Sequence, residues 1–272
     1  LVYAFVTRAN GSVSDLPGGA LQPWMTGYDG INDFNEINDD GVHMVTAQNK
    51  SIDNLTLTGT WYYGADHTKF VDDQLAGALT GLGVTGLGDT NVLWGDAKYA
   101  ADMFTVGVQG GTIDPDGLDE TTGWGAMVSG KLAMFDLSAA YTSVDDGTVR
   151  MANFGTSVKT PLYTQSILDQ DVIAKDSDTF KLTAGMAALG GNFGLSYINA
   201  DLGSEAIGAV MYSGANLNAK GLAGDMSGTY EEIDFTYKTK VFNDSTTLFA
   251  AYVYQNDDRV DGLVNADGAD EQ

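Results

Sequence analysis

The chain has 272 residues, no cysteine and a formal net charge of −24. The lack of cysteine excludes a disulfide framework and a thiolate metal site, and the negative charge argues against nucleic-acid binding, which needs a basic surface. No apolar run approaches the ~18 residues that a membrane-spanning helix needs, which excludes a helical membrane protein but leaves open a membrane β-barrel, whose strands alternate.

Eleven segments have the pattern of β-strands, and none has convincing helical periodicity. The clearest is Leu55–Gly64 (LTLTGTWYYG), in which leucine, glycine and aromatic residues alternate with threonine. Such period-two alternation is typical of a strand with one apolar and one polar face. In chain order the segments are 1–9, 42–49, 54–64, 91–100, 103–112, 122–132, 135–143, 179–188, 192–200, 229–241 and 246–256.

The connections between these segments alternate in length. Tight turns are expected at 50–54, 101–102, 133–134, 189–192 and 242–245. Long connections are expected at 10–41, 65–90, 113–121, 144–178 and 201–228. In an up-and-down sheet this alternation puts all tight turns at one end and all long loops at the other, which is the layout of outer-membrane barrels with long extracellular loops. Soluble sandwiches with Greek-key crossings do not separate loop lengths in this way.

Charge divides along the chain in the same way. The net charge of −24 lies in the long connections and in the tail from residue 257, because acidic and basic residues balance elsewhere. We therefore expect an acidic surface at the long-loop end that attracts cations. Two connections, 10–41 and 144–178, are long enough to fold inward.

The predicted hairpins have one apolar and one polar face. In 122–143, a turn at Ala133–Met134 pairs Lys131 with Asp136 on the polar face. In a water-filled barrel, charged residues on that face line the channel and tune its ion preference. The candidate pore-lining residues are Asp96, Lys98, Lys131, Asp136, Lys181, Glu232, Asp234, Lys238 and Lys240.

Aromatic residues gather near the ends of the predicted strands. Those near the long loops are Trp61, Tyr63, Trp94, Trp124, Tyr141, Tyr230 and Tyr254, and those near the tight turns are Tyr99, Phe104, Phe135, Phe193 and Phe242. Two belts of this kind are typical of the two membrane–water interfaces. Ordinary aromatic enrichment in strands explains any single member equally well.

Other motifs give weaker signals. The stretch Gly81–Gly86 (GLGVTG) matches a dinucleotide fingerprint, but a turn and a strand follow it instead of a helix. His43 and His67 are isolated, so a zinc or serine–histidine site has little material. Two acidic clusters could bind Ca²⁺, although solvated acidic loops explain them as well. Their members are Asp33, Glu36, Asp39 and Asp40, and Asp114, Asp116, Asp119 and Glu120.

Three stretches resemble the major outer membrane porins of Campylobacter-type bacteria: SIDNLTLTGTWYYG, DTFKLTAGMAALGGNFGLSYINADLG and STTLFAAYVYQNDD. The resemblance covers about the last two thirds of a family member. It implies a trimeric barrel of about 18 strands that passes ions and small hydrophilic solutes, contacts outer-membrane lipid and lipopolysaccharide, and associates with calcium. No metal ligand can be transferred to this chain, since no motif aligns one.

The sequence therefore predicts an all-β, transmembrane, antiparallel up-and-down barrel, with 1–272 forming part of a single domain of about 16–18 strands. The chain is expected to lack strands at both ends. The predicted function is a cation-preferring porin of the bacterial outer membrane with no required cofactor, and not an enzyme. The alternative is a secreted or surface-attached β-rich protein that binds calcium or mediates adhesion.

Overall fold

The computed structural model describes residues 1–6, 8–10, 34–36, 41–65, 89–147, 150–151, 160–167, 172–203, 227–242 and 245–258. Within these residues the chain forms thirteen strands. Their bounds are β1 (Val2–Val6), β2 (Arg8–Asn10), β3 (Phe34–Glu36), β4 (Val42–Ile52), β5 (Leu55–Gly64), β6 (Thr90–Ala100), β7 (Phe104–Pro115), β8 (Thr121–Leu132), β9 (Phe135–Val144), β10 (Ser177–Ala188), β11 (Gly191–Leu202), β12 (Gly228–Val241) and β13 (Thr246–Asp257).

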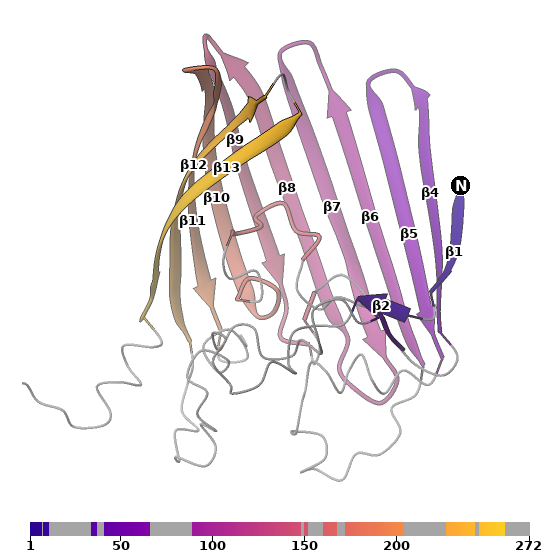
Figure 1. Ribbon diagram of the computed structural model, residues 1–272. Coiled ribbons are helices and arrows are strands. Elements are labelled where there is room, and N and C mark those ends of the chain that lie inside the picture. Colours follow the sequence, from indigo (N-terminus) through magenta and orange to yellow (C-terminus); the bar gives the residue numbers. More distant parts are fainter. Residues whose placement is uncertain are drawn as a thin grey trace, which may run out of the picture.

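Eleven of these strands form one sheet in which every neighbouring pair is antiparallel. The order is β1-β4-β5-β6-β7-β8-β9-β10-β11-β12-β13, so that each strand lies beside its neighbour in the sequence, and β2 and β3 pair separately. The sheet is strongly curved, with the tight turns at one end and, at the other, the strand ends that lead into the longer connections (Figure 1). This is the up-and-down arrangement that the alternating loop lengths predict.

The eleven predicted strands are all present, with ends that move by a few residues. Two predictions need correction. The first segment, 1–9, is not continuous, because β1 ends at Val6 and β2 pairs with β3 outside the large sheet. The connection predicted at 113–121 is shorter, because β7 stays paired to Pro115 and only 116–120 form the turn.

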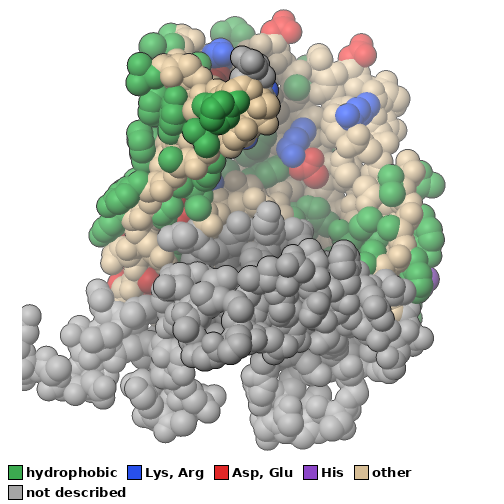
Figure 2. Space-filling model, viewed as in Figure 1, with side chains coloured by type: hydrophobic (Ala, Val, Ile, Leu, Met, Phe, Trp, Pro, Cys, Tyr) green, Lys and Arg blue, Asp and Glu red, His purple; other side chains and the backbone are tan. Residues whose placement is uncertain are grey.

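The two faces of the sheet differ in character. On the outer face large apolar side chains are exposed, as in Leu182 (45%), Phe235 (49%) and Tyr252 (70%). On the concave face, threonine, glutamine and charged residues occupy the alternate positions. Figure 2 shows hydrophobic side chains along the outer flanks and charged side chains in the hollow between them. The alternation in the sequence therefore becomes an apolar exterior and a polar interior surface.

Within the described part of the chain, no helix has the length and apolar character needed to cross a membrane.

Candidate functional site

The strand register brings all nine predicted charged residues to the concave face. Asp96 pairs with Gln109, and Lys131 pairs with Asp136 across the tight turn, with 3.6 Å between Nζ and Oδ1. Lys181 and Glu232 flank the same residue of β11. Because side chains at even spacing along a strand share a face, the remaining members follow from these pairs. The shared face is an observation, whereas their role in lining a pore stays a prediction.

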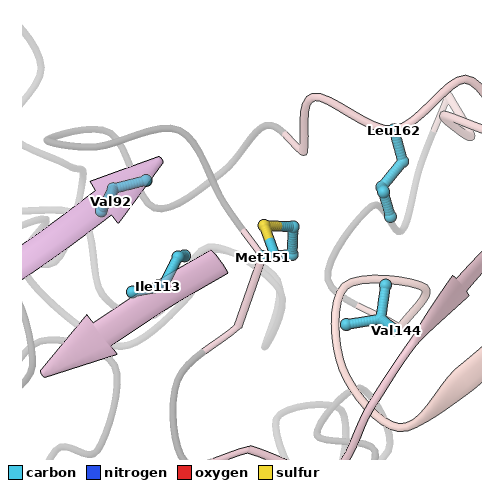
Figure 3. Close-up of a cluster of buried hydrophobic side chains, with 5 residues drawn as sticks. All are labelled: Val92, Ile113, Val144, Met151 and Leu162. Carbon is cyan, nitrogen blue, oxygen red and sulfur yellow. The ribbon is translucent and has the colours of Figure 1, made fainter. Parts of the chain in front are cut away.

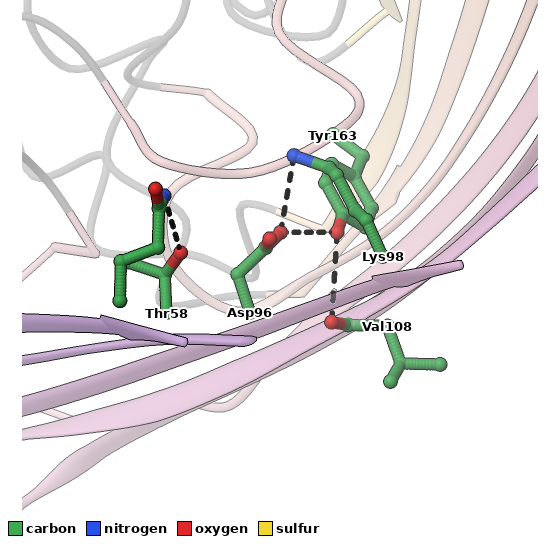
Figure 4. A network of polar contacts seen from close by, with 6 residues as sticks. Thr58, Asp96, Lys98, Val108 and Tyr163 are labelled. Carbon is green, nitrogen blue, oxygen red and sulfur yellow. Dashed lines mark hydrogen bonds and ion pairs between the residues drawn. The ribbon is translucent and has the colours of Figure 1, made fainter. Parts of the chain in front are cut away.

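One segment, 160–167, lies against this polar face and is held first by Asp96. The Tyr163 hydroxyl donates a hydrogen bond to the Asp96 carboxylate, and Lys98 Nζ lies 3.2 Å from the same carboxylate (Figure 4). The Lys98 ammonium also lies 5.1 Å from the centre of the Tyr163 ring, within the range of a cation–π contact. Burial and the hydrogen bond to Asp96 raise the pKa of Tyr163, so the phenol stays a neutral donor.

Two further side chains, from β7 and β9, hold the middle of the segment. In the orientation that satisfies its amide group, Gln109 accepts a hydrogen bond from Tyr163 N at 2.8 Å and donates to the Pro161 carbonyl at 3.2 Å. The Thr142 and Thr164 hydroxyl oxygens are 2.6 Å apart. The two Gln109 bonds satisfy backbone groups of an irregular segment that has no sheet partner, as buried polar groups require, and the threonine pair adds a contact between side chains.

The end of the segment is held by charged residues of β10 and β12. Lys181 Nζ donates to the Gln165 carbonyl, and Ile167 N donates to Glu232 Oε1 at 2.7 Å. Glu232 is fully buried, and its other oxygen accepts from the Tyr230 hydroxyl at 2.6 Å. Charge-assisted hydrogen bonds of this kind are stronger than neutral ones. Five strands thus fix one segment against the concave face.

Apolar contacts fix the same region near the long-loop end. Met151 and Leu162 pack with Val92, Ile113 and Val144 of the sheet (Figure 3). All five side chains are buried. Because burial of such side chains is worth about 1.5–3 kcal/mol each, Met151 and Leu162 hold their parts of the 144–178 connection inside the curve of the sheet. The sequence shows only that the 144–178 connection is long enough to fold inward, and the structure places 150–151 and 160–167 inside the curve.

Of the seven aromatic residues predicted to form a belt at the long-loop end, five lie on the outer face and two do not. Those that share the outer face are Trp61, Tyr63, Trp124, Tyr141 and Tyr254. Trp94 instead lies on the concave face, where it packs beside Val92 and Ile113. Tyr230 is fully buried on that face too. Each lies an even number of positions from a charged residue of the concave face on the same strand, so its side chain points to that face too.

The aromatic residues predicted near the tight turns keep their place. Tyr99, Phe104, Phe135 and Phe193 lie on the outer face, because each pairs with outward neighbours. Phe242 lies in the turn between β12 and β13 and is 78% exposed. Whether either belt meets a membrane interface remains a prediction.

The acidic clusters do not form a metal centre in the part of the chain that the structure describes. Asp114 lies in β7, and Asp116, Asp119 and Glu120 lie in the following turn. Among the described residues no group of three or more histidine, cysteine or acidic side chains is placed to hold a metal ion. Glu36 lies in β3, while Asp33, Asp39 and Asp40 lie outside the described residues.

No family model matches the chain, and no curated protein sequence matches it. Solved structures do match. One is OccK7 (OpdD) of Pseudomonas aeruginosa, with a TM-score of 0.55, 11% identity, 83% of this chain covered and 56% of that chain. OccAB2 of Acinetobacter baumannii has a TM-score of 0.53 and 15% identity over 94% of this chain and 57% of that chain. OccK3 (OpdO) of P. aeruginosa has a TM-score of 0.53 and 12% identity over 82% of this chain and 56% of that chain.

This chain has the fold of these outer-membrane porins. The predicted all-β, antiparallel, up-and-down architecture is therefore confirmed. At identities of 10–15% the likeness extends to the fold alone. The chain spans a little over half the length of the structures it matches.

Proposed function

We propose that this protein is a porin of the bacterial outer membrane, which lets ions and small hydrophilic solutes diffuse passively through a water-filled channel. The observation that carries the proposal is the opposite character of the two faces, together with segment 160–167 on the concave side. A segment anchored on the polar face narrows the passage along that face and so limits the size of the solutes that can pass. The porin fold of the matched structures supports the same function.

The apolar outer face favours lipid as its environment. About half of the surface of each large side chain there is exposed, as in Leu195 (50%), Phe235 (49%) and Leu248 (53%). An exposed apolar surface of this extent is unfavourable in water. A soluble calcium-binding or adhesive protein, the second candidate, would need another layer to cover this face. The acidic long connections fit both candidates.

The finer parts of the proposal rest on charge and on the resemblance. Cation preference follows from the net charge of −24, which concentrates cations at the long-loop end. Membership of the Campylobacter-type porins, a trimeric assembly, calcium association and contact with lipopolysaccharide follow from the resemblance of three sequence stretches. The proposal assigns no catalytic role to any residue.

Planar-bilayer recording tests the proposal. The purified protein should give stepwise ohmic conductance, and a KCl gradient should give a reversal potential of the sign for K⁺ over Cl⁻. Cation preference should weaken as salt rises, because the Debye length falls from about 30 Å at 0.01 M to about 3 Å at 1 M. Absence of conductance would refute the channel, whereas conductance with anion preference would refute only the electrostatic part.

A further inference from the structure

The five tight turns share a feature that a channel does not require. In each turn, or at the strand end directly before it, one large apolar side chain is more than half exposed. These side chains are Ile52 (55%), Met103 (77%), Met134 (59%), Leu189 (86%) and Phe242 (78%). Turns that end in water are normally built from glycine, asparagine, aspartate and serine. The turn end of this sheet therefore exposes a large apolar side chain beside each of its five turns, next to polar residues such as Asn54 and Asp102.

The backbone makes two of these residues unexpected. Leu189 and Phe242 each have a φ of 53°, in the left-handed region. Bulky residues are rare there, whereas asparagine and glycine are favoured. The turn between β4 and β5 shows the ordinary choice, since Asn54 occupies its left-handed position with a φ of 65°. Leu189 and Phe242 gain little from packing within the described chain, because most of their surface is exposed.

The height of the apolar outer face shows where the turns lie. On β8 that face runs from Trp124, near the long loops, to Leu132 at the turn. At about 3.4 Å per residue and a tilt of about 40°, this stretch spans roughly 21 Å, close to the ~25 Å apolar band of membrane barrels. On β10, Phe180 to Ala188 gives the same span, and Leu189 follows directly. The band therefore ends at the turns.

We propose that the tight turns are membrane anchors, with Leu189 and Phe242 seated at the boundary between headgroups and acyl chains of the leaflet at that end. This inference rests on the proposed function, because it needs the outer face to meet lipid. The occupant is lipid because the turn tips continue the apolar outer face without a polar break on β8 and β10. The competing outcomes are that a second copy of the chain, or another protein, covers the turns.

Single-cysteine labelling tests the placement, and the chain has no cysteine to interfere. Leu189→Cys and Phe242→Cys would carry an environment-sensitive fluorophore in proteoliposomes. Asp116→Cys, in the turn between β7 and β8 at the opposite end, is the matched control. We expect lipid-borne nitroxide to quench Leu189→Cys and Phe242→Cys several-fold more than Asp116→Cys, and aqueous iodide to show the reverse.

Two results would overturn the anchor. Efficient iodide quenching at all three positions would place the turns in water, and protection from both quenchers would place them against protein. Conductance of the same proteoliposomes separates this failure from failure of the proposed function, because a working channel can have turns in water.

The double variant Leu189→Asn/Phe242→Asn gives a second and independent test. Asparagine relieves the left-handed backbone, so turns in water would leave the urea midpoint in vesicles unchanged or raise it. Turns anchored in lipid would lower the midpoint, because the apolar side chains are lost. The sign of the shift thus decides between the two positions.

Discussion

Removing the carboxylate of Glu232 should loosen the inward segment. In Glu232→Ala, Ile167 N loses the acceptor that lies 2.7 Å away, in a place where Glu232 itself is fully buried. A hydrogen bond to a charged group is worth about 1.5–3 kcal/mol. At about 1.4 kcal/mol per tenfold change, the equilibrium between the inward and displaced positions should shift by roughly 10- to 150-fold.

Single-channel recording measures this shift. Glu232→Ala should show more frequent excursions to a higher conductance and a larger exclusion limit for neutral polymers. Tyr230→Phe is the matched control, because it removes only the donor to the other Glu232 oxygen and leaves the bond to Ile167 intact. Glu232→Gln keeps an acceptor and should lie between the two. Indistinguishable traces from Glu232→Ala and the wild type would refute the role of this contact in holding the segment.

Three further predictions concern stability in lipid vesicles, each measured by urea unfolding. Leu182→Lys, on the outer face, should lower the free energy of unfolding by about 2–4 kcal/mol, whereas Thr183→Lys on the concave face should change it little; equal losses would contradict the assignment of faces. Gly111→Ala would place its Cβ 2.0 Å from a backbone carbonyl oxygen and should cost about 1–3 kcal/mol, while Gly59→Ala, with no atom within 4 Å, should be neutral. Lys131→Met breaks an exposed ion pair with 3.6 Å between its atoms and should change stability by less than about 1 kcal/mol; a larger loss would mean that the pair is buried by something else.

The strands and their faces could be predicted because apolar and polar residues alternate along a strand whose two faces meet different environments. In β5, threonines occupy the concave positions, while Leu55, Leu57 and Trp61 face outward. Tight turns could be predicted because the apolar positions shift from even-numbered to odd-numbered residues, or the reverse, across only a few residues. Both signals are local, and the structure confirms them.

The errors at Trp94 and Tyr230 come from weighing residue type above parity. Trp94 has the same parity as Asp96 and Lys98, so a strand that points these charges inward must also point the tryptophan inward. Gly111 provides the room, since a Cβ there would lie 2.8 Å from the Trp94 ring. Tyr230 shares its parity with Glu232 and Asp234 in the same way. Parity was visible in the sequence and would have corrected both assignments.

The contacts of the inward segment could not be predicted, because they join residues far apart in the sequence. Tyr163 meets Asp96 and Ile167 meets Glu232, across separations of 67 and 65 positions. The length of the 144–178 connection allowed it to fold inward but did not identify its partners. The sequence does not show that Glu232 is a buried acceptor, because its burial depends on the curved sheet and on the segment packed against it.

The central claim is that the concave face meets water and the outer face meets lipid. The most direct measurement is the reactivity of single cysteines with a charged, membrane-impermeant thiol reagent in proteoliposomes, on the cross-strand pairs Thr183 with Ser138 and Leu182 with Ala139. The account predicts fast reaction at Thr183→Cys and Ser138→Cys and protection at Leu182→Cys and Ala139→Cys. Equal or faster reaction at the outer pair would contradict it.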